Sequence, residues 1–444
     1  MRTHPWAVML LCLCPALGGA MDSPSPDSEA SLPASYATWR YLTRLEATGL
    51  ALLPGDGVGG VVSYAQVTPM LVVAEGEAFG LNMGAPVRLR LAGGEVGAGL
   101  VRREDWDSLS DWGQLVHALK LGSDTAPVGL WVGALEGYSL LSGHLVRRYS
   151  NRANPDYHPA GASLTGTVGP LYVEAFASDV LGARLMGAQA EVDLQHLFTG
   201  PPRQRGRYTL GLSAVHDWGR AGGASPPVTL AHLDGTAVVV VRPGFELHVL
   251  GGWGGRPGVG GAWGAVVGVG ADALSPTLDM KLRLEVRRQQ GGFRQGYFGP
   301  DYELGRLSAV GTPGLPQAQA PFPNGFSTYA EAVVAWDGVR LGGLLQRHLS
   351  LSLGAEVFGW GRVDVDGRLT AQLANRNLEV ALNGLALGMG QPGARHLYSG
   401  QVRWRFGHKL YVLAEGGTLL FAEADGALRP GAFASLGLGM DNAR

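Results

Sequence analysis

Residues 278–287 read Leu-Asp-Met-Lys-Leu-Arg-Leu-Glu-Val-Arg, so that apolar and charged side chains alternate without a break. Successive side chains of a β-strand point to opposite faces of the sheet. The stretch therefore predicts a strand with one apolar face and one face that carries five charges. Such a two-faced strand is typical of a transmembrane β-barrel, whose apolar side chains contact lipid while the polar ones line the lumen.

The same alternation recurs, more weakly, along much of the chain. Residues 188–195, 208–214 and 398–406 place apolar side chains at every second position, and turn signals such as Pro392-Gly393 separate these runs. The runs long enough to cross lipid predict an all-β fold, an antiparallel barrel of about 16 strands, with 14–18 allowed by uncertain boundaries. The predicted barrel covers residues 58–440.

The composition agrees with a barrel and excludes other classes. The chain of 444 residues has 70 glycines and a formal net charge of only −2, so no global basic field predicts nucleic-acid binding. Beyond the N-terminal leader no apolar run is long enough for a transmembrane helix, and any membrane crossing must therefore use strands.

The N-terminal residues predict export. Residues 1–20 combine a basic start at Arg2, an apolar stretch and a small-residue cleavage site, as in a signal peptide. Cys12 and Cys14 both lie in this leader, so the mature chain is expected to contain no disulfide. Residues 21–57 are predicted to be a flexible N-terminal segment that can form one short helix near Tyr36 to Leu50.

Three further segments depart from the strand pattern. Residues 104–122 carry apolar side chains at helical spacing and predict one short helix inserted between strands. Residues 289–326 are rich in Gly and Pro and predict a long extracellular loop, which either folds inward to narrow the pore or is simply mobile. Residues 441–444 are predicted to be a C-terminal tail.

The leader, the alternating strands, the lumen-type charges and the turn spacing together resemble Gram-negative outer-membrane β-barrel proteins of the porin-like kind. The resemblance covers residues 58–440 and is one of class. It implies a location in the outer membrane, contact with the lipid bilayer and lipopolysaccharide, and insertion by the barrel assembly machinery. One departure concerns the last strand, because many such barrels end on an aromatic residue and this chain ends on Arg444.

The predicted lumen face is the best functional lead. Its charges either line a water-filled path and select solutes, or neutralise one another in a closed barrel. A porin-like channel for passive passage of small polar or anionic solutes is the favoured hypothesis, since a barrel of this size usually leaves an aqueous channel. A plugged structural or surface-display barrel is the alternative. The residues expected to line the path are Lys281, Arg283, Glu285, Arg368, Arg403 and Arg405.

A second basic cluster lies between His144 and His158. Arg147, Arg148 and Arg152 are predicted to stand at the pore mouth, where guanidinium groups can bind anionic solutes. The competing and favoured interpretation is a solvated loop between two strands.

No residue pattern predicts a cofactor, a metal or an enzyme. Asp105, Asp107 and Asp111 do not have the spacing of a calcium loop, and Asp111 is better interpreted as a helix cap. An outer-membrane hydrolase stays as a further alternative because Ser142 lies near His144 in the sequence. The identity of the solute and the oligomeric state are left open.

Overall fold

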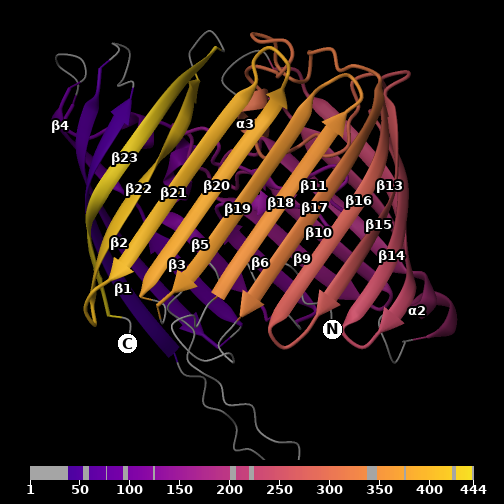
Figure 1. The fold of residues 1–444 in the computed structure, drawn as a ribbon, viewed down its shortest axis with the longest axis horizontal. Coiled ribbons are helices and arrows are strands. Elements are labelled where there is room, and N and C mark those ends of the chain that lie inside the picture. Colours follow the sequence, from indigo (N-terminus) through magenta and orange to yellow (C-terminus); the bar gives the residue numbers. More distant parts are fainter. Residues whose placement is uncertain are drawn as a thin grey trace, which may run out of the picture.

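The computed structural model describes residues 39–53, 60–76, 78–93, 99–123, 126–200, 207–219, 225–337, 348–374, 377–422 and 427–442. The predicted signal peptide lies outside these ranges. Among the described residues, 21 strands form one antiparallel sheet that closes on itself. Closure is made by the first and last strands, which pair in register from Arg44 with Asp441 to Leu53 with Ala432. The chain is thus a closed β-barrel (Figure 1).

The strands follow one another around the wall in chain order, apart from one small hairpin. β3 and β4 pair with successive halves of the same neighbour, so they share one position and the wall has twenty strand positions. The hairpin β7–β8 forms a separate two-stranded sheet. The strands are β1 (Trp39–Leu53), β2 (Val62–Glu75), β3 (Phe79–Gly84), β4 (Val87–Ala92), β5 (Val116–Leu121), β6 (Val128–Gly133), β7 (Glu136–Tyr138), β8 (Tyr149–Ser150), β9 (Gly161–Val168), β10 (Leu171–Ala177), β11 (Leu185–Asp193), β12 (Tyr208–Asp217), β13 (Val228–Arg242), β14 (Phe245–Gly255), β15 (Trp263–Leu274), β16 (Leu278–Gln290), β17 (Gly325–Asp337), β18 (His348–Phe358), β19 (Val363–Leu373), β20 (Leu378–Met389), β21 (Arg395–Arg405), β22 (Leu410–Ala422) and β23 (Leu428–Asp441).

Helical structure is sparse. The two 3-10 helices η1 (Arg103–Asp105) and η2 (Leu109–Leu115) lie between β4 and β5. The α-helices α2 (Leu194–Thr199) and α3 (Tyr302–Gly305) are each about one turn long. Within the described ranges no helix has the length and apolar character needed to cross a membrane.

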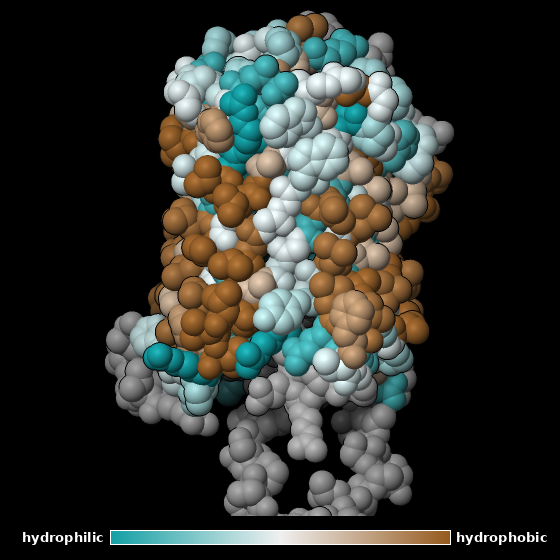
Figure 2. All heavy atoms as spheres, turned by 90° about the vertical axis from the view of Figure 1, so that its right-hand side faces the viewer, coloured by the Kyte–Doolittle hydropathy of each residue, from teal (hydrophilic) through white to brown (hydrophobic). Residues whose placement is uncertain are grey.

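The decisive strand β16 has the orientation that its sequence predicts. Leu282, Leu284 and Val286 are 41–50% exposed, whereas Glu285 and Arg287 are buried. Its apolar side chains therefore point outward and its charged ones into the barrel. On the side formed by β13 to β15, Figure 2 shows a belt of hydrophobic residues with hydrophilic residues above and below it. A closed ring with this belt is the architecture of a membrane-spanning barrel.

The predicted number of strands was too low, because some strands carry apolar side chains on both faces. In β1, Leu50 and Leu52 are buried and pack with Val62 and Tyr64 of β2. The segment that was predicted to be flexible with a short helix is therefore the first strand of the barrel, which begins at residue 39 rather than 58.

The predicted helix over residues 104–122 is also wrong. The first part forms the short 3-10 helices, and Val116–Leu121 is strand β5, which pairs with β3 and β6. Helical spacing misled here because η2 turns its apolar residues outward, with Trp112 at 52% exposure, while Asp111 and Gln114 are buried.

The last strand agrees with its predicted pattern. Leu436, Leu438 and Met440 are 49–64% exposed on one face of β23. This strand extends to Asp441, so the predicted tail begins one residue later, and residues 443–444 lie outside the described ranges.

Candidate functional site in the lumen

Two long connections between strands lie at one rim of the barrel (Figure 1). β1 begins and β23 ends at the opposite rim. We call residues 134–160 inner loop 1 and residues 291–324 inner loop 2. They are joined by a parallel bridge between Val146 and Phe298. Backbone hydrogen bonds flank it: the Arg147 N–H donates to the Phe298 carbonyl (3.1 Å), and the Gly296 N–H donates to the His144 carbonyl (2.7 Å). The two loops are therefore one structural unit.

An apolar core fixes this unit to the inside of the wall. Phe298 and Tyr302 are almost completely buried, with ring centroids 4.8 Å apart, and they belong to one cluster with inward-facing wall residues. The hydroxyl of Tyr302 donates a hydrogen bond to Asp217 at the end of β12. The wall residues of this cluster are Phe176, Leu185, Val215, Val228 and Leu230. Part of the predicted loop, residues 293–302, therefore packs against the inner face of the wall.

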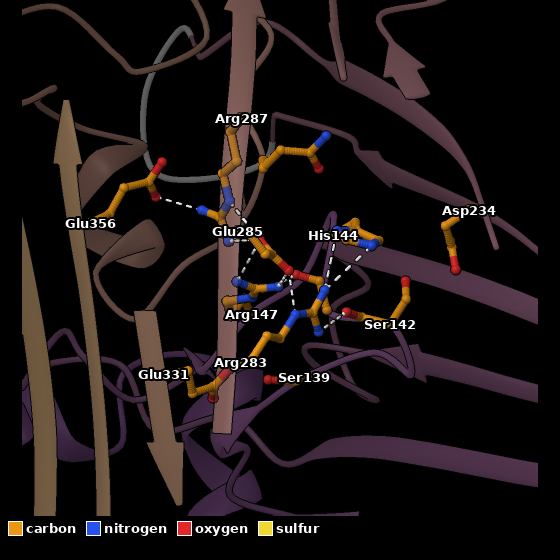
Figure 3. Close-up of polar contacts among 12 residues, drawn as sticks. Ser139, Ser142, His144, Arg147, Asp234, Arg283, Glu285, Arg287, Glu331 and Glu356 are labelled. Carbon is orange, nitrogen blue, oxygen red and sulfur yellow. Dashed lines mark hydrogen bonds and ion pairs between the residues drawn. The ribbon is translucent and has the colours of Figure 1, made fainter. Parts of the chain in front are cut away.

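The polar centre of the site is the carboxylate of Glu285 on β16, which is 0% exposed. Arg147 of inner loop 1 lies 3.3 and 3.4 Å from its two oxygens, and Arg287 donates to it at 2.7 Å. Arg283 makes a third ion pair with it. Figure 3 shows the three guanidinium groups converging on this carboxylate. One negative charge thus faces three positive ones.

Tyr329 of β17 supports the same cluster. The guanidinium carbons of Arg147 and Arg287 lie 4.2 and 4.1 Å from the centroid of its ring, which is the geometry of cation–π contacts. Arg287 also donates to Glu356 of β18 at 2.6 Å. These contacts hold the arginines in fixed positions, and the side chains remain charged because guanidinium does not lose its proton in proteins.

Beside this cluster lies a cavity of about 60 Å³, which is large enough for several water molecules. Both inner loops and the wall line it. Arg294 of inner loop 2 differs from the rest, because it has no ion pair within the described part of the chain and its buried Nε has no hydrogen-bond partner. Its guanidinium carbon lies 5.7 and 5.5 Å from the ring centroids of Tyr297 and Phe322. Burial and the neighbouring Arg362 lower its pKa from the usual value. The charged lining residues are Arg147, Arg148, Arg287, Arg294, Arg362, Asp301, Glu356, Asp364 and Asp366.

The pore-mouth arginines are not on a solvated loop, which corrects the interpretation favoured from the sequence. Arg147 and Arg148 are 5% and 9% exposed inside the barrel. Arg148 pairs with Asp366 and lies 3.7 Å from Glu331. Arg152 lies apart from them, where it donates to the carbonyls of Pro159 (3.0 Å) and Gly113 (3.3 Å). The three arginines therefore do not form one group.

The predicted pore-lining residues are likewise distributed. Lys281, Arg283 and Glu285 share the inner face of β16, and Arg368 lies 3.5 Å from Glu136 of inner loop 1. Arg403 and Arg405 belong to a separate cluster near the closure of the barrel. There Arg403 contacts Glu46 (3.3 Å) and Glu379 (3.0 Å), and Arg405 contacts Asp441 (2.7 Å).

The carboxylate cluster of residues 105–111 has a structural role. Asp105 is fully buried and accepts hydrogen bonds from Arg88 and Arg102, both at 2.6 Å. Asp111 accepts from the backbone N–H of Ser108 (3.0 Å) at the start of η2, which agrees with a capping role, although it stands inside the helix rather than before it. Arginine thus supplies the cations that the Asp105 carboxylate binds.

The serine and histidine considered for a hydrolase have other partners. Ser142 donates to Gln189 of β11 at 3.1 Å. The His144 ring faces His232, with centroids 4.5 Å apart, and Arg283 lies 3.3 Å from its Nε2. Burial, helped by Arg283, lowers the pKa of His144 well below its usual value, so the ring is neutral at pH 7.

The residues that sequence reasoning missed are mainly Arg294, Arg362 and Glu356. Arg294 lies in a loop without any periodic pattern, and Arg362 stands just before β19, so neither belonged to an alternating run. All three line the cavity beside inner loop 2, which only the folded chain creates.

No protein-family model matches the sequence, and the search of curated proteins gives no match. Among solved structures, the chain is similar to OccAB2 of Acinetobacter baumannii, with 11% identity, a TM-score of 0.37, and coverage of 91% of this chain and 97% of that one. It is also similar to a BenF-like porin of Pseudomonas fluorescens and to the outer-membrane protein OpdK of Pseudomonas aeruginosa. Each of these two comparisons has 11% identity, a TM-score of 0.34, and coverage of 91% of this chain and 98% of the other.

Proposed function

We propose that this chain is a porin-like channel of a Gram-negative outer membrane, through which small polar and anionic solutes pass without chemical change. The observation that carries the proposal is the arginine-lined cavity at the inner loops. Five of its nine charged lining residues are arginines, and one of these, Arg294, has no bound carboxylate among the described residues.

A guanidinium that is not bound to a carboxylate and lies beside a cavity is suited to a passing anion. Guanidinium groups bind carboxylate and phosphate oxygens in a planar, two-pronged manner. The remaining arginines are already paired with Glu285, Glu356, Asp364 or Asp366, so their charges shape the local potential without binding solute tightly. Weak binding at several fixed charges permits both entry and release.

The plugged barrel is the second candidate, because the apolar core of the inner loops fills part of the lumen. Recording of the full chain in planar lipid bilayers under a potassium chloride gradient separates the two. The channel proposal predicts discrete conductance steps with a reversal potential of the sign for chloride preference. Absence of steps at high protein load supports the plug, and a cation-selective reversal potential contradicts the anionic preference.

A further inference from the structure

A cluster of three metal-type ligands lies next to the site described above but outside it. His232 and Asp234 stand two residues apart on β13 and both point into the barrel, where they are 1% and 5% exposed. His144 of inner loop 1 is 2% exposed and faces them. One possible ligand atom from each residue lies within 4.8 Å of those of the other two. Figure 3 shows Asp234 to the right of His144.

Two atoms of the cluster lack the partners that buried polar atoms require. Nδ1 of His232 and Oδ1 of Asp234 make no hydrogen bond, although both are shielded from solvent. They stand 3.5 Å apart, which is too far for a good hydrogen bond. Two ligands bound at about 2.1 Å to a tetrahedral metal stand about 3.4 Å apart. The separation therefore fits one edge of a metal coordination tetrahedron.

Gln295 of inner loop 2 completes the surroundings of His232. Its amide nitrogen lies 3.1 Å from His232 Nε2, and its amide oxygen has no partner. A half-turn of the amide places the oxygen against Nε2–H, so that Nε2 donates and the lone pair of Nδ1 points toward Asp234. Histidines that bind metals usually donate their other ring N–H to an oxygen in this way.

The guanidinium of Arg283 also contacts His144, at 3.5 Å from Nδ1 and 3.3 Å from Nε2. The His144 nitrogen that binds the ion must give up its contact with this guanidinium. The charge of Arg283 still opposes a nearby cation, although Glu285 offsets part of it.

We propose that His232, Asp234 and His144 bind a divalent transition-metal ion of the zinc class, with water as the fourth ligand. Two imidazoles and one carboxylate form a known type of zinc ligand set. The ion would connect inner loop 1 to strand β13 and so fix the position of the loop in the lumen. The inference does not depend on whether the barrel conducts.

Cobalt binding tests the site, because tetrahedral Co²⁺ absorbs visible light strongly. The full chain in detergent micelles is first stripped with a chelator and then titrated with Co²⁺. One equivalent per chain is expected to bind with tetrahedral absorption bands and to be displaced by Zn²⁺. Asp234→Asn and His232→Ala are expected to weaken this binding at least tenfold, and Gln295→Met about 10- to 100-fold.

His216→Ala is the matched control, since His216 lies on the neighbouring strand β12 and bonds to Thr229 at 2.8 Å instead. It is expected to bind Co²⁺ like the natural chain. Circular dichroism verifies that each variant keeps its β-structure, and the isosteric Asp234→Asn keeps the test valid if His232→Ala does not fold. Equal Co²⁺ binding by the natural chain and Asp234→Asn, or no tetrahedral spectrum in the natural chain, overturns the proposal.

Discussion

Arg147 and Glu285 are 138 residues apart in the sequence, yet they form an ion pair inside the barrel at 3.3 Å. Arg147 belongs to inner loop 1 and Glu285 to wall strand β16. The pair therefore connects the lumen unit to the wall at the point where three arginines converge. The inner loops are therefore fixed inside the barrel by buried charges as well as by their apolar core.

Removal of this carboxylate is expected to destabilise the barrel strongly. Glu285→Gln leaves the buried guanidinium groups of Arg147 and Arg287, and the partly buried one of Arg283, without their shared carboxylate. The loss of one member of a buried ion pair typically costs about 3–5 kcal/mol. The thermal midpoint of unfolding in micelles should fall clearly. Asp279→Asn, on the same face of β16 and without an ion pair among the described residues, should change it little. Equal midpoints for the two variants would show that Glu285 does not hold the loop.

The apolar core of the inner loops gives a second expectation. Phe298→Ala removes a ring that is 0% exposed and should cost about 3–5 kcal/mol. Limited proteolysis should then cleave the inner loops faster while the wall strands stay protected. Phe198→Ala, whose ring on α2 is 79% exposed, is the control and should stay within about 0.5 kcal/mol of the natural chain. Unchanged protection in Phe298→Ala is the result that argues against an anchored loop.

The orientation of β16 can be tested by placing a charge on its outward, apolar face. Leu284 is 50% exposed on the apolar face, and an arginine there would cost about 2–4 kcal/mol near the middle of the bilayer. Leu284→Arg should therefore reduce the yield of folded barrel in lipid vesicles. Lys281→Gln, on the inner face, should fold as well as the natural chain. If Lys281→Gln were the variant that fails, the two faces would be reversed.

Arg283 gives a prediction for the proposed metal site. Its positive charge lies 3.3 Å from His144, so Arg283→Gln should bind Co²⁺ more tightly than the natural chain. In this variant Glu285 still forms its ion pairs with Arg147 and Arg287, so most of the surrounding contacts are preserved. Isothermal titration calorimetry measures the change, and weaker binding would indicate that Arg283 positions His144 rather than opposing the ion.

The sequence predicted the wall better than the interior. Strand β16 alternates without a break because one of its faces meets lipid and the other meets charged groups, so its orientation could be predicted. β1 could not be recognised as a strand, since Leu50 and Leu52 add an apolar inner face that masks the alternation. The pairing of Arg147 with Glu285 depends on a loop that folds back over more than a hundred residues, and no local pattern encodes it.

Arg294 decides the functional proposal, and the natural chain allows a direct test because its two cysteines, Cys12 and Cys14, lie in the predicted leader. Arg294→Cys should lower the chloride preference measured as a reversal potential in planar bilayers, whereas Arg242→Cys, on an exposed site at the end of β13, should not. Coupling a positively charged aminoethyl thiol reagent to Arg294→Cys should restore the preference, and a negatively charged sulfonate reagent should reduce it further. A reversal potential that does not respond to the charge placed at this position would contradict the account.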